Sequence, residues 1–152
     1  MTQDLHSPEI VLRSTQIIAI ALIAGVISTT GIVTFLGNTL PPRMANTGDT
    51  ISFVMAGFTA LCVVAMGVAS NWGVRADASR DPKALAAAWQ TRTIVKYAIC
   101  EIAALANAVA YIVEQNWWSL ALQIVMLAVM VLIFPTKTRL DQFIESQTAF
   151  TQ

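Results

Sequence analysis

One acidic residue, Glu101, lies inside an apolar segment of the chain and is the strongest candidate for a chemical role. It is two residues from the centre of the segment 93–113, so a membrane-spanning helix would hold its carboxyl within roughly 5 Å of the bilayer midplane. A charge at that depth is costly unless it is protonated, hydrated or paired, and this favours the neutral acid. An acid that can release its proton there suits a proton or cation site. The alternative is a protonated acid that only donates a hydrogen bond to a neighbouring helix.

Thr59 is the expected neutral partner of Glu101. It belongs to a second apolar segment, 51–69. Counted from the segment ends, its hydroxyl lies close to the depth of the Glu101 carboxyl. Hydrogen bonds between polar side chains stabilise helix pairs in lipid, so we expect these two residues to form the ion-binding pair.

Two amide side chains are placed for a structural role. A turn of only three residues makes the segments 93–113 and 117–134 an antiparallel hairpin, in which Asn107 and Gln123 have equal depth. We expect their amides to hydrogen-bond across the hairpin and to stabilise it rather than to bind a ligand.

Small residues recur at every fourth position in the first two apolar segments. Gly25 belongs to such a series in the first segment, and Ala56 and Ala60 belong to one in the second. Faces of this kind let helix backbones approach closely in lipid. They predict packing within a bundle or, alternatively, self-association of the chain.

Other chemical motifs are missing from the sequence. His6 is the only histidine and lies in a polar tail, and no glycine-rich phosphate loop is present. Cys62 and Cys100 both lie in apolar segments, which argues against a disulfide framework. The sequence therefore predicts neither an enzyme nor a metal site, and it indicates no cofactor.

The composition defines the class of protein that must position these residues. Of 152 residues, 56% are apolar and 12% are charged, and the formal net charge is zero. The mean hydropathy is +0.64. Eighteen charged residues are too few to cover a soluble domain of this size. The apolar content excludes disorder, and the balanced charge excludes a nucleic-acid partner. An integral membrane protein remains.

Four segments are long and apolar enough to cross a bilayer, which takes about 17–25 residues. They are residues 17–36, 51–69, 93–113 and 117–134.

Helical structure is also expected outside these four segments. Asp81 and Pro82 form a helix start, because aspartate caps free N–H groups and proline tolerates the first helical position. The third helix should therefore begin at about residue 82 and project from the membrane. After Pro135, apolar residues recur at helical spacing over 136–147. This predicts a short interfacial helix, with a frayed tail as the alternative.

Basic residues predict the orientation. Eight of the nine lysines and arginines lie on one side of the four segments, and only Arg43 lies on the other. The positive-inside bias then places both termini in the cytoplasm, with the plasma (inner) membrane as the location.

The chain also resembles a known family. Arg80-Asp81-Pro82, followed by Ala98-Ile99-Cys100-Glu101, is similar over about residues 52–113 to the hairpin of the c subunit (proteolipid) of rotary ATP synthases. That family has a cytoplasmic Arg-Gln/Asn-Pro loop and an ion-binding carboxylate about twenty residues further on. Here Glu101 follows Arg80 by 21 residues. The resemblance implies that Glu101 binds a proton or Na⁺ and that Arg80, Asp81 and Pro82 form the rotor-facing loop.

The second half of the chain also looks like a set of small four-helix bacterial membrane proteins, which implies a fold without an activity. We therefore expect one all-α domain over residues 1–152, with four transmembrane helices in antiparallel hairpins. Two functions stay open: proton or cation binding and translocation at Glu101, or a structural or accessory subunit. The expected partners are the lipid bilayer and either further copies of the chain or a larger membrane complex.

Overall fold

The computed structural model describes residues 7–37, 49–71 and 82–149, and all regular structure in these ranges is helical. The helices are α1 (Pro8–Gly37), α2 (Thr50–Asn71), α3 (Pro82–Glu114), α4 (Trp117–Leu132) and α5 (Lys137–Ala149).

The helix ends follow from local chemistry. α3 begins at Pro82, as the sequence predicts. The turn into α4 places Gln115 in the left-handed backbone region, with φ of 51°. Asn116 then caps α4, because its side chain accepts a hydrogen bond from the backbone N–H of Ser119. α4 ends at Leu132, three residues before Pro135.

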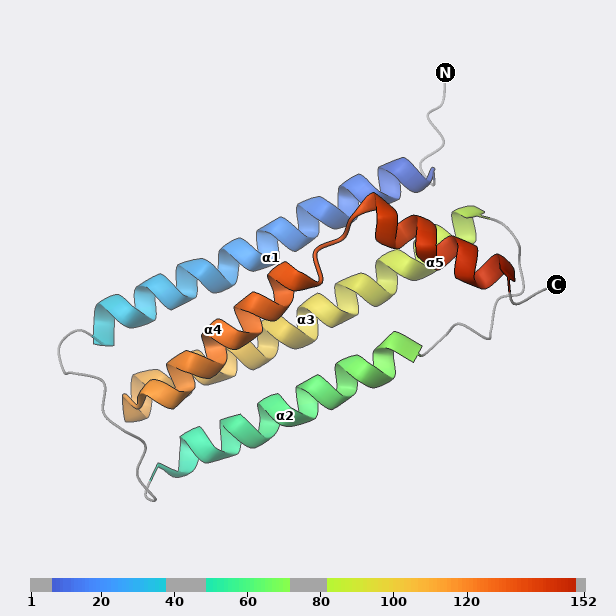
Figure 1. The fold of residues 1–152 in the computed structure, drawn as a ribbon. Coiled ribbons are helices and arrows are strands. Elements are labelled where there is room, and N and C mark those ends of the chain that lie inside the picture. The colour runs from blue at the N-terminus through green and yellow to red at the C-terminus, as the bar shows by residue number, and fades with distance from the viewer. Residues whose placement is uncertain (1–6, 38–48, 72–81, 150–152) are drawn as a thin grey trace.

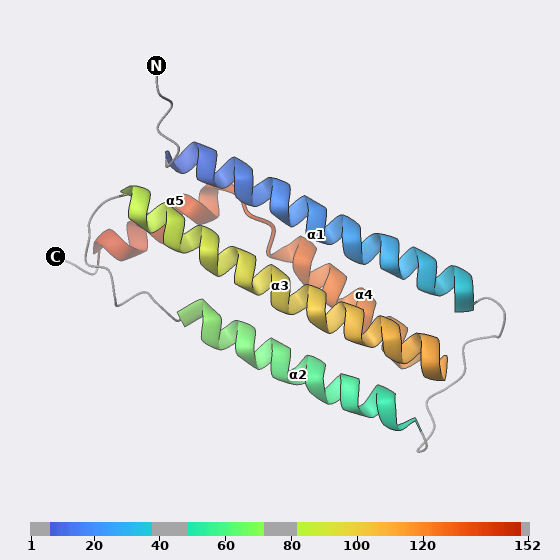
Figure 2. The same ribbon diagram turned by 180° about the vertical axis from the view of Figure 1, so that it is seen from behind.

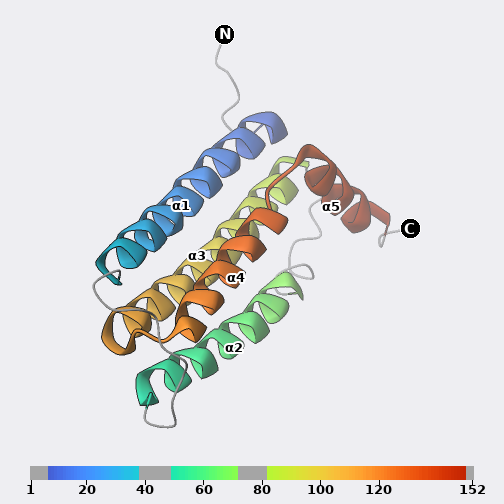
Figure 3. The ribbon, with the colours of Figure 1, turned by 60° about the vertical axis from the view of Figure 1, so that its left-hand side comes forward.

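α3 is the central helix and contacts each of the other four. α1, α3 and α2 lie side by side with α3 in the middle (Figure 1). The view from behind shows that α4 packs on one face of α3 (Figure 2). Figure 3 shows the same arrangement from the side, with α5 turned away from the axis of α4. Side chains near the middle of α3 are therefore close to several helices at once.

The largest buried cluster joins α1, α2, α3 and α4 around the middle of α3. It contains small residues at close contacts, such as Ala103 and Ala104, and longer side chains between helices, such as Met126 and Met130. The buried hydroxyl of Tyr97 donates a hydrogen bond of 2.7 Å to the backbone carbonyl of Met130, which ties α3 to α4. Dense packing of this kind fixes the rotation of each helix about its axis.

α5 folds back onto the end of the bundle where α1 and α3 begin. The chain turns by 69° between α4 and α5. Leu140 is buried with Val11 of α1 and with Ala86 and Trp89 of α3, and Phe143 packs against this cluster. The short helix expected over 136–147 is thus present as α5, and it packs on protein as well as facing outward.

Three of the described helices, α1, α2 and α3, are long and apolar enough to cross a membrane. α4 has 16 residues and is about 24 Å long, somewhat shorter than a hydrocarbon core of about 30 Å. The described residues thus contain three candidate spans, or four if α4 and α5 are counted as one bent span. Many large apolar side chains, such as Phe35, Leu61 and Leu132, are exposed on the bundle surface. Such a surface suits lipid rather than water.

Candidate functional site

Glu101 lies in the middle of α3 on the side that faces α1. Its side chain is half-buried. A Cβ atom built on Gly25 of α1 would lie 3.6 Å from Oε1 of Glu101, an ordinary contact distance, so the carboxyl lies next to this glycine. Gly25 itself is exposed on the bundle surface. The carboxyl therefore lies at the edge of the α1–α3 contact, near the outer surface of the bundle.

Among the described residues, the Glu101 carboxyl forms neither a hydrogen bond nor an ion pair. The same part of the chain contains no group of three His, Cys, Asp or Glu side chains that could hold a metal ion. A carboxyl without a cation or a hydrogen-bond donor beside it is costly to ionise in hydrocarbon. Chemically, this arrangement can hold a proton and can give it up to a water or a base that reaches the edge of the contact.

Thr59 does not partner Glu101 as expected. Its hydroxyl donates a hydrogen bond to the backbone carbonyl of Met55 and accepts one of 2.6 Å from Nδ2 of Asn107. Thr59 lies at the level of Asn107, about 9 Å further along α3 than Glu101, and not at the depth of Glu101 as expected. Glu101 and Asn107 also point to different helices. Six residues at about 100° each separate them by about 120° around α3. Glu101 therefore faces α1, and Asn107 faces α2.

The expected hydrogen bond between Asn107 and Gln123 is also replaced by others. Nε2 of Gln123 donates to the hydroxyl of Thr30 on α1 at 2.9 Å. Nδ2 of Asn107 donates to Thr59 and to the carbonyl of Ala103. Both amides are fully buried, and their oxygens have no hydrogen-bond partner. Together they join α3 to α2 and α4 to α1 instead of joining the two helices of the hairpin.

A double-mutant cycle tests the Asn107–Thr59 contact. Asn107→Ala and Thr59→Val should each lower the free energy of unfolding, and the coupling between them should be about 0.6 kcal/mol and at most about 1.7 kcal/mol. The measurement is reversible unfolding in mixed micelles. The control cycle pairs Asn107→Ala with Gln123→Ala, which should be nearly additive. Strong coupling in the control and none with Thr59 would restore the bond expected from the sequence.

A polar network that the sequence interpretation missed closes the opposite end of the bundle. The carboxylate of Glu114 accepts hydrogen bonds from the backbone N–H groups of Ile51 (2.9 Å) and Ser52 (2.8 Å). It thereby caps α2, where the helix dipole favours a negative charge. Asn116 donates to the Ser52 hydroxyl, and the Ser119 hydroxyl donates to the same oxygen at 3.0 Å. The sequence signal that could have revealed this network is a set of polar residues at the ends of three different apolar segments.

Glu114 lies just beyond the apolar segment 93–113, and its environment favours the charged form. Desolvation by burial acts to raise the pKa of Glu114, but hydrogen bonds from Ser52 and Ile51 outweigh it and lower the pKa below its ordinary value. The stabilisation from this cap is therefore present above the ordinary pKa of a glutamate and is lost as the pH falls through the lowered one.

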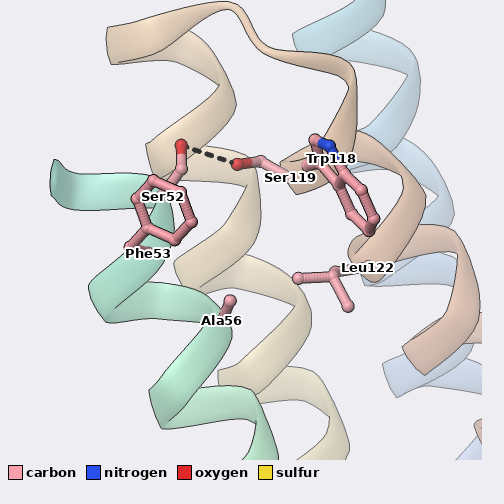
Figure 4. Close-up of a pocket in the computed structure, with 6 residues that line it drawn as sticks. All are labelled: Ser52, Phe53, Ala56, Trp118, Ser119 and Leu122. Carbon is pink, nitrogen blue, oxygen red and sulfur yellow. Dashed lines mark hydrogen bonds between the residues drawn. The ribbon is translucent and has the colours of Figure 1, made fainter. Parts of the chain in front are cut away.

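An apolar groove of about 430 Å³ opens between α2 and α4 next to this network. Figure 4 shows its lining, formed by Ser52, Phe53, Ala56, Trp118, Ser119 and Leu122. The two serine hydroxyls bond to each other (Figure 4), so the groove offers mainly hydrocarbon to an occupant.

The small residues expected to pack between helices have different environments. Ala56 is half-buried beside the groove, whereas Ala60 is exposed. The buried stripe of α2 passes through Ser52, Thr59 and Cys62, and Ala60 is turned about 100° from Thr59. Packing within the bundle therefore does not include Ala60.

Of the loop residues singled out in the sequence, Pro82 begins α3. Arg80 and Asp81 lie outside the described residues.

The all-helical fold and its long apolar helices define the class: the chain has the features of a multi-pass helical membrane protein. No family model, curated protein or solved structure matches it. The similarity to the proteolipid hairpin therefore rests on the residues quoted above.

Proposed function

We propose that this chain is a non-enzymatic, four-span protein of the plasma membrane in which Glu101 takes up and releases a proton within the bilayer. The observation that carries this proposal is the position of the carboxyl beside Gly25, half-buried and without a hydrogen-bond partner among the described residues. A permanent charge in this setting is costly, and a switchable charge there is useful only if a proton moves.

The same position favours a proton over Na⁺. Hard cations take several oxygen ligands at once. The neighbour of Oε1 across the helix contact is Gly25, which has no side chain to contribute a ligand. The Thr59 hydroxyl, a candidate second ligand, is engaged with Asn107 instead.

A second function stays a candidate because Gly25 is exposed and the carboxyl is only half-buried. A helix from another copy, or from a different membrane subunit, could pack against Gly25 and accept a hydrogen bond from protonated Glu101. The protein would then be an accessory subunit of a larger membrane complex, and the acid would never need to ionise.

Reaction with dicyclohexylcarbodiimide separates these functions. This apolar reagent modifies protonated carboxyls in hydrocarbon, so we expect one adduct on Glu101 in membranes, with a yield that falls as the pH rises. Mass spectrometry of the full-length protein identifies the site, and Glu114 is the matched acid that should stay unmodified because it is charged. Protection by Na⁺ would assign the site to that ion. An unreactive Glu101, or a yield independent of pH, would leave the accessory role.

The proposed orientation places both termini in the cytoplasm. It is supported by the charge bias and by the packing of Leu140 of α5 against Val11 of α1. These contacts bring the C-terminal helix to the end where α1 begins, as an even number of crossings requires.

Cysteine labelling in intact cells tests this orientation. A cysteine at Asn46 should react with an impermeant maleimide, and one at Ser79 should react only after permeabilisation. The native Cys62 and Cys100 are both buried and provide a low background. External labelling at position 79 would reverse the orientation.

A further inference from the structure

Three basic side chains come together where α3, α5 and the end of α2 meet. Arg92 and Lys96 lie one turn apart on α3, and Arg139 lies one turn before Phe143 on α5. The guanidinium carbon of Arg92 lies 5.4 Å from the centroid of the Phe143 ring. The basic face of α3 therefore packs against the basic face of α5. We call Arg92, Lys96 and Arg139 the basic cluster.

The two arginines are held in place by backbone carbonyls. Nη2 of Arg92 donates to the carbonyl of Ser70 near the end of α2 at 2.5 Å, and Nη2 of Arg139 donates to the carbonyl of Leu132 at the end of α4 at 2.8 Å. Each bond uses one nitrogen of a guanidinium that carries five N–H donors. Nε of Arg92 is buried and has no partner. Donors thus remain available after the arginines have been positioned.

Among the residues that the structure describes, no acid neutralises the basic cluster. None of the three side chains forms an ion pair with a carboxylate of the described residues. Arg92 and Arg139 are both near enough to Lys96 to repel its ammonium group. Like charges held together are unfavourable unless an anion lies between them or close by.

We propose that the basic cluster binds a phosphate group, carried by the headgroup of an anionic membrane lipid. Arginine presents a planar fork that matches two phosphate oxygens, and lysine adds a compact charge. The cluster lies at the boundary of the bilayer, since Arg92 directly precedes the apolar segment 93–113 and Arg139 follows the segment 117–134. Basic pockets between helices at this level bind the headgroups of anionic lipids.

Native mass spectrometry of the full-length protein in mild detergent tests the proposal with phosphatidylglycerol, phosphatidylcholine and inorganic phosphate as probes. We expect one saturable phosphatidylglycerol site and weaker binding of phosphatidylcholine. Lys96→Gln should weaken phosphatidylglycerol binding about fivefold, the contribution of one surface cation. Lys96 makes no hydrogen bond to another described residue, so this variant should fold even if Arg92→Gln does not.

Arg13→Gln is the matched control, because Arg13 is exposed at the same end of the bundle. It should leave phosphatidylglycerol binding unchanged. Competition by millimolar inorganic phosphate would support the phosphate site and assign it to a free ion, whereas lack of competition assigns it to the lipid. Equal binding of the two lipids, or equal losses in the Arg13 and Lys96 variants, would overturn the proposal.

Discussion

Glu101→Gln is expected to abolish proton movement through the protein while the bundle still folds. Glutamine has nearly the same size and can still form hydrogen bonds, but it cannot lose a proton. The measurement uses proteoliposomes with a pH-sensitive dye inside and a potassium diffusion potential as the driving force. The rate for the variant should fall to that of liposomes without protein. Glu101→Asp should be partly active, because it ionises but withdraws the carboxyl from Gly25 by one methylene.

Three further variants distinguish the loss of the proton site from a change in the packing around it. At Gly25, an alanine Cβ would lie 3.6 Å from Oε1 of Glu101, an ordinary contact distance. Gly25→Ala should therefore keep most of the flux, whereas Gly25→Leu should displace the carboxyl and slow it. Glu114→Gln removes an acid at the end of the bundle and should leave the flux unchanged. A Glu101→Gln variant with wild-type flux would end the proton-site proposal.

Asn116→Ala is expected to cause the largest loss of stability, about 2 kcal/mol in the free energy of unfolding. Asn116 is fully buried and caps α4 through the Ser119 N–H. Loss of a cap costs roughly 0.5–2 kcal/mol, and a buried donor or acceptor left without its partner costs about 1–3 kcal/mol. Its amide also donates to Ser52, so the variant loosens the start of α2 as well. Reversible unfolding in mixed micelles measures the loss.

The neighbouring residue is the control for Asn116→Ala. Gln115 has φ of 51°, a left-handed conformation that glycine adopts without strain. Gln115→Gly should therefore leave stability unchanged or slightly higher. Asn116→Asp should also destabilise, because it keeps the cap but loses the donor to Ser52 and adds a charge near Glu114. A loss below about 0.5 kcal/mol for Asn116→Ala would show that the network contributes little.

The sequence predicted the positions of the helices along the chain better than their rotation. Hydropathy located the apolar segments, and proline chemistry located the start of α3 at Pro82. α1 begins earlier than the apolar segment that starts at residue 17, because its polar first turns pack on protein. There Ser14 accepts a hydrogen bond from Gln90 of α3, and Gln16 donates to the carbonyl of Pro135. Such contacts between distant segments leave no periodic signal.

In the candidate site, too, the rotation of the helices was harder to predict than the positions of residues along the chain. Counting residues placed Glu101 near the middle of α3, where the structure has it. It placed Thr59 close to the depth of Glu101, whereas Thr59 contacts Asn107 six residues further along α3. The direction of each side chain depends on which face of α3 each neighbouring helix covers. That choice is made by packing around small residues such as Ala103 and Ala104. The sequence therefore identified Thr59, Asn107 and Gln123 as polar core residues but paired them incorrectly.

Infrared difference spectroscopy of Glu101 tests the proposed proton site most directly. Spectra of the reconstituted protein are compared between wild type and Glu101→Gln, in H₂O and D₂O, across a range of pH. We expect a carbonyl band of a protonated carboxylic acid that is missing in the variant, shifts in D₂O and disappears as the pH rises. A wild-type spectrum without this band, or with a band that neither exchanges in D₂O nor responds to pH, would contradict a proton held and released at Glu101.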